Sequence, residues 1–157
     1  MSMSSQTRHK IALATTAREI ARCSPVMREL RPQVAEKDFV ARVQKQQKEG
    51  YQLAFLESEG EVRAVAGYRI YDLLFCGRTL YVDDLVTRQA DRSKGFGELL
   101  FEWLIGRALE DGCEHLTLDS GVQRFAAHRF YLRQRMEITS HHFALELKKQ
   151  SEAFNNR

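Results

Sequence analysis

Residues Leu80–Leu100, LYVDDLVTRQADRSKGFGELL, decide the fold of this 157-residue chain. A strand-like apolar pattern runs into a polar turn, and the turn becomes a glycine-bearing helix start at Arg92–Gly97; the apolar positions are Leu80, Val82, Leu85 and Val86. Glycines let the backbone approach a ligand closely, and the first turn of a helix leaves amide N–H groups unpaired. The turn is therefore predicted to bind an anion. Because Asp83 and Asp84 lie just upstream, an anion site and an acid/base group share one short segment.

The composition predicts one soluble globular domain over residues 1–157, with residues 148–157 as a frayed tail. The chain is 43% hydrophobic and 29% charged, which leaves enough apolar residues for a core. The net charge is +3, and acidic and basic residues are interleaved along the chain. Nucleic acid is therefore not an expected partner.

The sequence predicts a cytoplasmic protein with no membrane partner, because it shows neither an apolar signal core nor a membrane-spanning apolar run. Its three cysteines, Cys23, Cys76 and Cys113, have neither a metal-binding spacing nor the even number of a disulfide framework. The histidines are scattered, so no metal site is expected.

The segment upstream of Leu80 predicts a strand, a helical region broken by two prolines, and two further strands. The expected elements are a strand at His9–Leu13, a helical region at about Thr16–Val43 interrupted at Pro25 and Pro32, an amphipathic helix at Asp38–Lys48, and strands at Tyr51–Glu57 and Val62–Phe75 joined by a turn at Ser58–Gly60.

The segment downstream predicts alternating helices and strands. The expected elements are a helix at Gly95–Glu110, a strand at His115–Asp119, a helix at Arg124–Arg133 and a strand at Phe143–Leu147. This order indicates a mixed α/β sheet that combines an antiparallel meander with a helical crossover.

The glycine turn alone does not identify its ligand. The dinucleotide-binding pattern G-x-G-x-x-G requires a third glycine where this chain has Leu100, and the GK[ST] of a phosphate-binding P-loop is missing. A plain strand-to-helix turn remains the alternative to an anion site.

The wider pattern resembles the GNAT superfamily of acetyl-CoA-dependent N-acetyltransferases. Arg92-x-x-Gly95-x-Gly97 follows a strand that ends in Asp-Leu-Val, and Ala127-x-x-Phe130-Tyr131 comes after the next short strand. The stretches YVDDLV and GFG are also similar to the spermidine/spermine or thialysine acetyltransferase branch, which carries two adjacent acids. The resemblance implies an α/β (α+β) fold, with a mixed, mostly antiparallel central sheet flanked by helices in a single domain.

The resemblance implies a binding site for acetyl-CoA. The coenzyme A pyrophosphate would be held by the amides of Ser93, Lys94, Gly95, Phe96, Gly97 and Glu98, with added charge from Arg92 and Lys94. The pantetheine arm would bond to the backbone of Leu85, Val86 and Thr87. The family commonly has Asn where this chain has Arg124, which is a candidate phosphate contact, and Gly-Phe where it has Arg135-Met136.

Three residues are candidates for the chemistry. An alkylamine is mostly protonated near neutral pH, so transfer to it needs a base, for which Asp83 is the first candidate and Asp84 the second. Successive strand residues point to opposite faces, so one of the two is expected to face the substrate. The resemblance assigns Tyr131 as the acid that protonates the leaving thiolate.

The sequence therefore predicts transfer of an acetyl group from acetyl-CoA to a primary amine of a small molecule, by direct attack in a ternary complex. The alternatives are a non-catalytic acyl-CoA-binding regulatory module and an acetyltransferase acting on a protein or peptide amine. A cationic acceptor, such as a polyamine or an amino-acid side chain, is expected from the charge of Asp72, Asp83, Asp84 and Asp119. A homodimer is possible because family members are often dimers.

Overall fold

The computed structural model describes residues 9–147, in two compact units divided between Leu118 and Asp119. The larger unit contains a five-stranded sheet in the order β1-β2-β3-β4-β5, with strands β1 (His9–Leu13), β2 (Gln52–Ser58), β3 (Glu61–Leu73), β4 (Gly77–Thr87) and β5 (His115–Leu118). The first four strands form an antiparallel meander, and β5 runs parallel to β4. The predicted mixed, mostly antiparallel sheet is thus confirmed.

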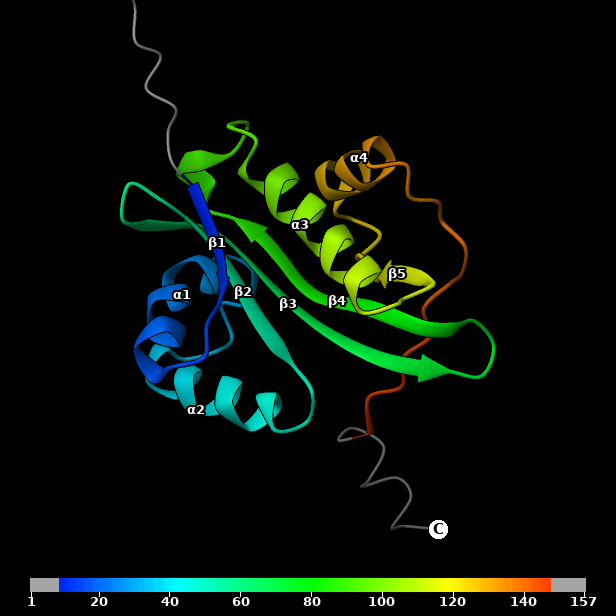
Figure 1. Ribbon diagram of the computed structural model, residues 1–157, viewed down its shortest axis with the longest axis horizontal. Helices are drawn as coiled ribbons and strands as arrows, with labels where there is room; N and C mark the ends of the chain where they lie inside the picture. The colour runs from blue at the N-terminus through cyan, green and yellow to red at the C-terminus, as the bar shows by residue number, and fades with distance from the viewer. Residues whose placement is uncertain (1–8, 148–157) are drawn as a thin grey trace, which may run out of the picture. The chain divides into compact units, whose positions relative to one another are not determined.

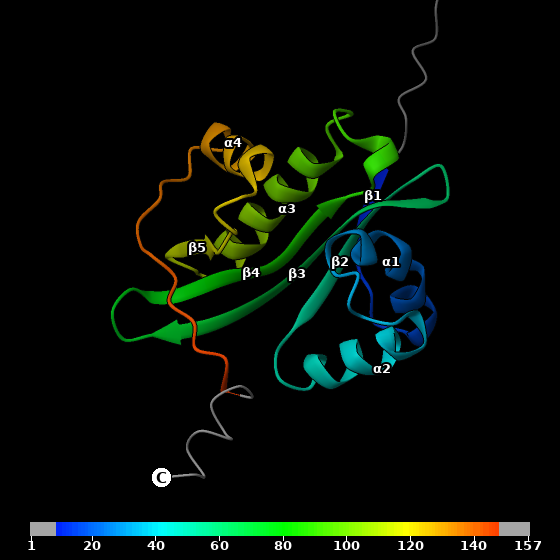
Figure 2. The same cartoon turned by 180° about the vertical axis from the view of Figure 1, so that it is seen from behind.

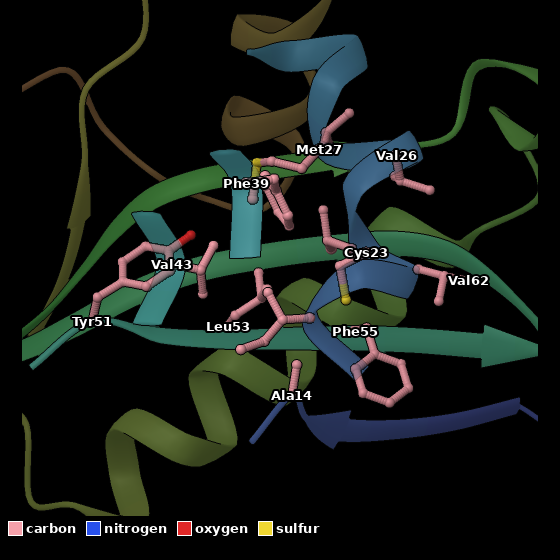
Figure 3. Packing of buried hydrophobic residues seen from close by; sticks show 13 residues of the cluster. Ala14, Cys23, Val26, Met27, Phe39, Val43, Tyr51, Leu53, Phe55 and Val62 are labelled. Atoms are coloured by element: carbon pink, nitrogen blue, oxygen red, sulfur yellow. The ribbon is translucent and has the colours of Figure 1, made fainter. Parts of the chain in front are cut away.

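Helices cover both faces of this sheet. Figures 1 and 2 show α1 (Ala17–Leu30) and α2 (Glu36–Gln47) on one side and α3 (Phe96–Glu110) on the other. The core on the first side is drawn in Figure 3, where Cys23 and Met27 of α1 and Phe39 of α2 pack onto Leu53 and Phe55 of β2. On the second side, Tyr68 of β3 meets Trp103 of α3 edge to face, with ring centroids 6.2 Å apart.

The helical region after β1 is one helix up to Leu30, and the predicted break at Pro25 is wrong. Thr16 and Glu19 form a capping box that satisfies amides at the start of α1. One missing hydrogen bond at Pro25 is tolerated because a continuous apolar stripe of the same helix is buried: Ile20, Cys23, Val26 and Met27. The predicted second break is confirmed, since α1 ends just before Pro32.

The remaining expected elements are confirmed with small shifts at their ends, except the last. The hairpin between β2 and β3 turns at Glu59 and Gly60, which both have positive φ. The smaller unit contains α4 (Phe125–Arg133), and residues 136–146 have no regular secondary structure. The predicted strand at Phe143–Leu147 is therefore wrong: alternation of apolar residues specifies two faces, but a strand also needs a partner to pair with. The predicted frayed tail at 148–157 lies outside the described residues.

Candidate active site

A β-bulge in β4 brings both candidate acids to one face of the sheet. Gly67 of β3 pairs with Asp84 and Tyr68 pairs with Val82, so Asp83 is an extra residue of β4 without a partner on β3. The extra residue shifts the alternation of side chains by one position. Both carboxylates consequently lie on the face covered by α1 and α2, and the expectation that they point to opposite faces is wrong.

Asp84 has a hydrogen-bond donor on each of its carboxylate oxygens. Nε of Arg31, the residue that caps the C-terminus of α1, donates to Oδ1 at 2.7 Å. The hydroxyl of Tyr51 donates to Oδ2 at 2.9 Å. Burial, and next the charge of Asp84, raises the pKa of Tyr51 well above its usual value, so this hydroxyl stays a donor. Asp84 is thus a saturated carboxylate, held between α1 and the start of β2.

Asp83 has one carboxylate oxygen left over. Nε of Arg69 donates to its Oδ2 at 2.7 Å, whereas its Oδ1 has no hydrogen-bond partner among the described residues. Burial raises the pKa of Asp83 above the usual value of 3.8, and the hydrogen bond and charge of Arg69 only partly offset this rise. A carboxylate with a raised pKa and an available oxygen is a better proton acceptor than an ordinary exposed aspartate.

Arg31 and Arg69 connect these acids to the helices. Nη2 of Arg31 donates to the backbone oxygen of Asp83 at 2.9 Å. Nη2 of Arg69 donates to Oε1 of Gln46 in α2 at 2.8 Å, and its guanidinium lies 5.4 Å from the ring centre of Tyr51. Residues of α1, α2, β3 and β4 therefore fix the two carboxylates together.

Sequence reasoning did not single out Arg31, Tyr51 or Arg69, because contacts between distant elements leave no local signal. The bulge in β4, by contrast, does leave a signal in the sequence. Apolar residues of β4 facing α3 are spaced by two from Leu80 to Val82, but by three from Val82 to Leu85. Such a phase change in a strand pattern is typical of an inserted residue.

The end of β4 is paired on one side only. Its antiparallel pairing with β3 continues to Thr87, opposite Ala64, whereas its parallel pairing with β5 stops at Val82, opposite Leu118. Residues 85–87, the predicted pantetheine contacts, thus have no β5 partner. Backbone groups on that side of β4 are free of strand pairing and can bond an extended ligand.

The glycine turn has the features of an anion site. Ser93 and Gly95 adopt positive φ angles of 67° and 84°, and Gly95 is the N-cap residue directly before α3. Within residues 9–147, no acceptor bonds the amides of Gly95, Phe96 or Gly97. A Cβ at Gly95 would meet no atom within 4 Å, so the turn presents open backbone. Unpaired amides and the positive end of the helix dipole favour a bound anion here.

Asp91 anchors this turn, and the sequence analysis missed it. The residue is only 2% exposed, and its carboxylate accepts from Nε of Arg88 at 2.5 Å, Nζ of Lys94 at 3.0 Å and Nη1 of Arg63 at 3.4 Å. The hydrogen bond from Arg88, followed by that from Lys94, lowers the pKa of Asp91 to about 2. Lys94 is therefore paired with Asp91, while the structure shows no such partner for Arg92 among the described residues.

A pocket of about 460 Å³ lies beside the same turn. Lys94 and Phe96 line it together with His9, Ser58, Glu59, Arg63, Asp91 and Leu99. Both signs of charge are present on its wall and are largely paired with each other, so the pocket does not by itself indicate a ligand.

Tyr131 and Arg124 belong to the smaller unit. Tyr131 lies on α4, and Arg124 is the N-cap residue directly before this helix. Burial raises the pKa of Tyr131, and the charge of Arg124 partly offsets this rise. The phenol of Tyr131 therefore keeps its proton at neutral pH, as an acid catalyst must.

Within residues 9–147, no group of three or more His, Cys, Asp or Glu side chains is arranged to hold a metal ion. None of the helices in that range combines the length and the apolar character that crossing a bilayer requires.

Comparisons with known sequences place the chain in a family. The sequence profile of the Acetyltransferase (GNAT) family matches residues 14–135, which cross the boundary between the two units. An uncharacterized N-acetyltransferase of Bacillus subtilis (strain 168), YhdJ, is 36% identical over 118 residues, which are 74% of this chain and 83% of the relative.

Solved structures share the fold. A transcriptional regulator from Bacillus halodurans C-125 aligns with a TM-score of 0.78 at 21% identity, covering 88% of this chain and 99% of that protein. Glucosamine-6-phosphate N-acetyltransferase from Arabidopsis thaliana aligns with a TM-score of 0.68 at 22% identity, covering 88% and 98%. The predicted enzyme class is confirmed by the family and the relative, and the alternative of a non-catalytic module has no support from them. The chain belongs to the acetyltransferase (GNAT) family, whose members are acyltransferases that use acetyl-CoA.

Proposed function

We propose that the protein transfers an acetyl group from acetyl-CoA to a primary amine of a small molecule, by direct attack of the amine in a ternary complex. One observation carries this proposal. On a single strand, β4, Asp83 has an available oxygen and lies shortly before residues 85–87, whose backbone has no β5 partner. A proton acceptor and a binding edge for an extended ligand are thus adjacent in the chain.

The larger unit offers binding groups along the length of acetyl-CoA. The free edge of β4 at Leu85, Val86 and Thr87 would bond the pantetheine amides, and the turn at Ser93–Glu98 would bind the pyrophosphate. Arg92 adds charge there, and Lys94 adds charge if it leaves Asp91. Arg124 stands where the family commonly has Asn, and its charge makes it a candidate phosphate contact. When bound, acetyl-CoA supplies a thioester carbonyl open to attack.

Asp83 is the base in this proposal. Its Oδ1 accepts a proton from the substrate ammonium group, directly or through one water, and the neutral amine nitrogen then forms the new C–N bond. Asp84 has both oxygens occupied, so its role is to hold Arg31 and Tyr51 in place beside Asp83. The structure thereby gives a reason to prefer Asp83 over Asp84.

Tyr131 is proposed as the acid, on the basis of its place in the family pattern. The C–S bond breaks as the C–N bond forms, and the phenol of Tyr131 gives its proton to the departing sulfur. Its raised pKa keeps that proton available over the neutral range. The amine nitrogen loses a second proton as it becomes an amide, and this proton restores the phenol of Tyr131 through solvent. The proton that Asp83 accepted is released to solvent.

Direct attack is preferred over an acyl-cysteine route, because Cys23 and Cys113 are poor nucleophiles. Burial raises the pKa of Cys23 to about 12, and burial also raises the pKa of Cys113. The reactive form of cysteine is the thiolate, so these two residues remain in the unreactive thiol form at neutral pH.

The test is acetyl-CoA-dependent release of free thiol across a panel of primary amines and short peptides, with each N-acetyl product identified by mass spectrometry. Release with at least one small amine, and its loss in Asp83→Asn, supports the proposal. Saturable binding of coenzyme A without release for any amine would refute it, and release with peptides alone would redirect it to a protein acceptor.

A further inference from the structure

The groups around Asp83 leave specific hydrogen-bonding capacity unused. Both oxygens of Asp84 are occupied, and one oxygen of Asp83 remains. Each of the two arginines uses Nε and Nη2 for the contacts described above, and within the described chain Nη1 of either arginine has no acceptor. The site therefore offers one acceptor for an amine and N–H donors from two guanidinium groups.

The charge of this region also differs from what the acids alone suggest. Each carboxylate lies 2.7 Å from a guanidinium nitrogen, so the four charges cancel as two pairs. The side chains of Arg31 and Arg69 are 41% and 28% exposed, more than the 13% of Asp84 and the 22% of Asp83. An approaching polyamine would meet two ion pairs with no net charge, so this region gives little attraction to a substrate with several positive charges.

We infer that the acceptor is an amine that also carries an anionic group, a carboxylate or a phosphate, bound by Arg31 and Arg69 while the amine lies at Oδ1 of Asp83. This inference rests on the proposed function and names the class of its substrate. Guanidinium groups bind carboxylate and phosphate oxygens with charge-assisted hydrogen bonds, and both arginines have free N–H groups for them. The same arginines hold the acids in place, so they determine specificity as well as position.

A set of two-carbon amines isolates the anionic group. Ethylamine, β-alanine and phosphoethanolamine differ only in what the second carbon carries, and lysine against cadaverine repeats the comparison on a longer chain. We expect kcat/KM for the amine with the preferred anion to exceed that for its plain partner by about tenfold or more, as one or two charge-assisted hydrogen bonds predict. Which of β-alanine and phosphoethanolamine reacts faster distinguishes carboxylate from phosphate.

Variants separate recognition from positioning, because each ratio is taken within one variant. Arg31→Gln and Arg69→Gln are expected to lower the ratio of kcat/KM for the anionic amine to kcat/KM for its plain partner severalfold. This holds even where misplacement of Asp83 slows both substrates. Arg28→Gln is the matched control. Arg28 lies in the last turn of α1, the helix that Arg31 caps, and pairs with Glu36 at 3.6 Å. The kcat/KM ratio of anionic to plain amine in Arg28→Gln should equal that of the wild type. Thermal unfolding and binding of coenzyme A verify that each variant is folded.

The outcomes distinguish this inference from the proposed function. Equal or faster acetylation of ethylamine and cadaverine overturns the inference while supporting the proposed transfer to amines. A preference for the anionic amines that survives in both Arg31→Gln and Arg69→Gln also overturns it, since other residues would then bind the anion. Failure to acetylate any amine overturns both. A preference that falls in these two variants and persists in Arg28→Gln supports it.

Discussion

The hydroxyl of Tyr51 lies against Gly67 and donates a 2.9 Å hydrogen bond to Oδ2 of Asp84, the residue paired with Gly67 on the next strand. A Cβ at position 67 would lie 2.0 Å from this hydroxyl oxygen and 2.4 Å from the ring carbon that bears it. The glycine thus gives the tyrosine the space from which it reaches the acid.

Gly67→Ala is expected to destabilise the fold by about 2 kcal/mol, because the buried ring of Tyr51 must move and Asp84 loses a donor. Urea unfolding measures the change. Gly106→Ala is the matched control: Gly106 lies inside α3 with no atom within 4 Å of a built Cβ, so this change should stabilise by about 0.5–1 kcal/mol. Equal stability of Gly67→Ala and wild type would contradict the packing described here.

The two acids are expected to differ in the pH dependence of kcat/KM. The base must be ionised, so activity falls as pH drops through its pKa, and the raised pKa of Asp83 places this fall above the 3.8 of an ordinary aspartate. Asp83→Asn should remove that fall and lower kcat by about a hundredfold. Asp84→Asn should keep the fall and instead lower the free energy of unfolding by about 2 kcal/mol, since Arg31 loses its partner.

Steady-state rates over pH for both variants, with one good amine, provide the test. A pH profile that changes in Asp84→Asn but not in Asp83→Asn would reverse the assignment of the base.

The two acids show which features of the site local sequence patterns can predict and which they cannot. Local patterns predicted the glycine turn, the crossover helix and the strand that carries the acids, because a helix start and an apolar alternation are properties of a few consecutive residues. The face on which an acid lies depends on register with a neighbouring strand, and the bulge at Asp83 changed it. Arg69 lies on β3 and Tyr51 directly before β2, so their contacts with the acids became visible only in three dimensions.

Tyr131→Phe is expected to lower kcat by about a hundredfold, the usual effect of losing a general acid, with little change in the affinity for coenzyme A. Because burial raises the pKa of this phenol above the usual 10, its deprotonation should lower activity only at a higher pH than it would for an ordinary tyrosine. Turnover and calorimetric binding of coenzyme A are measured on the same preparation. Unchanged turnover would remove Tyr131 as the acid.

Asp91→Asn is expected to destabilise the fold by about 3 kcal/mol, because Arg63, Arg88 and Lys94 lose a shared buried carboxylate. Affinity for coenzyme A should also fall, since the turn before α3 loses its anchor. The folded-state pKa of about 2 lies below the ordinary 3.8, so the stabilisation is complete above pH 3.8 and disappears as pH falls through 2. The difference between wild type and variant should shrink over that window.

Glu61→Gln is the control for Asp91→Asn. Glu61 pairs with the same two arginines, at 3.0 Å and 3.2 Å, but its side chain is 59% exposed. Exposed ion pairs contribute little to stability, so Glu61→Gln should lower the free energy of unfolding by less than about 1 kcal/mol. The free energy of unfolding of both variants is measured by chemical unfolding from neutral to acid pH. Similar losses for the two would show that burial of Asp91 does not account for its contribution to stability.

Arg135→Gly is expected to stabilise the protein. α4 ends in a motif in which the amide of Met136 bonds the oxygen of Tyr131 and the amide of Arg135 bonds the oxygen of Leu132. This motif requires a left-handed residue after the cap, and Arg135 takes that place with φ of 64°. A side chain there costs roughly 1 kcal/mol that glycine avoids, so unfolding should require about that much more free energy. Arg129→Gly, inside the helix, should instead destabilise by about 1 kcal/mol. A loss of stability in both variants would mean that the side chain of Arg135 makes a stabilising contact that outweighs its backbone strain.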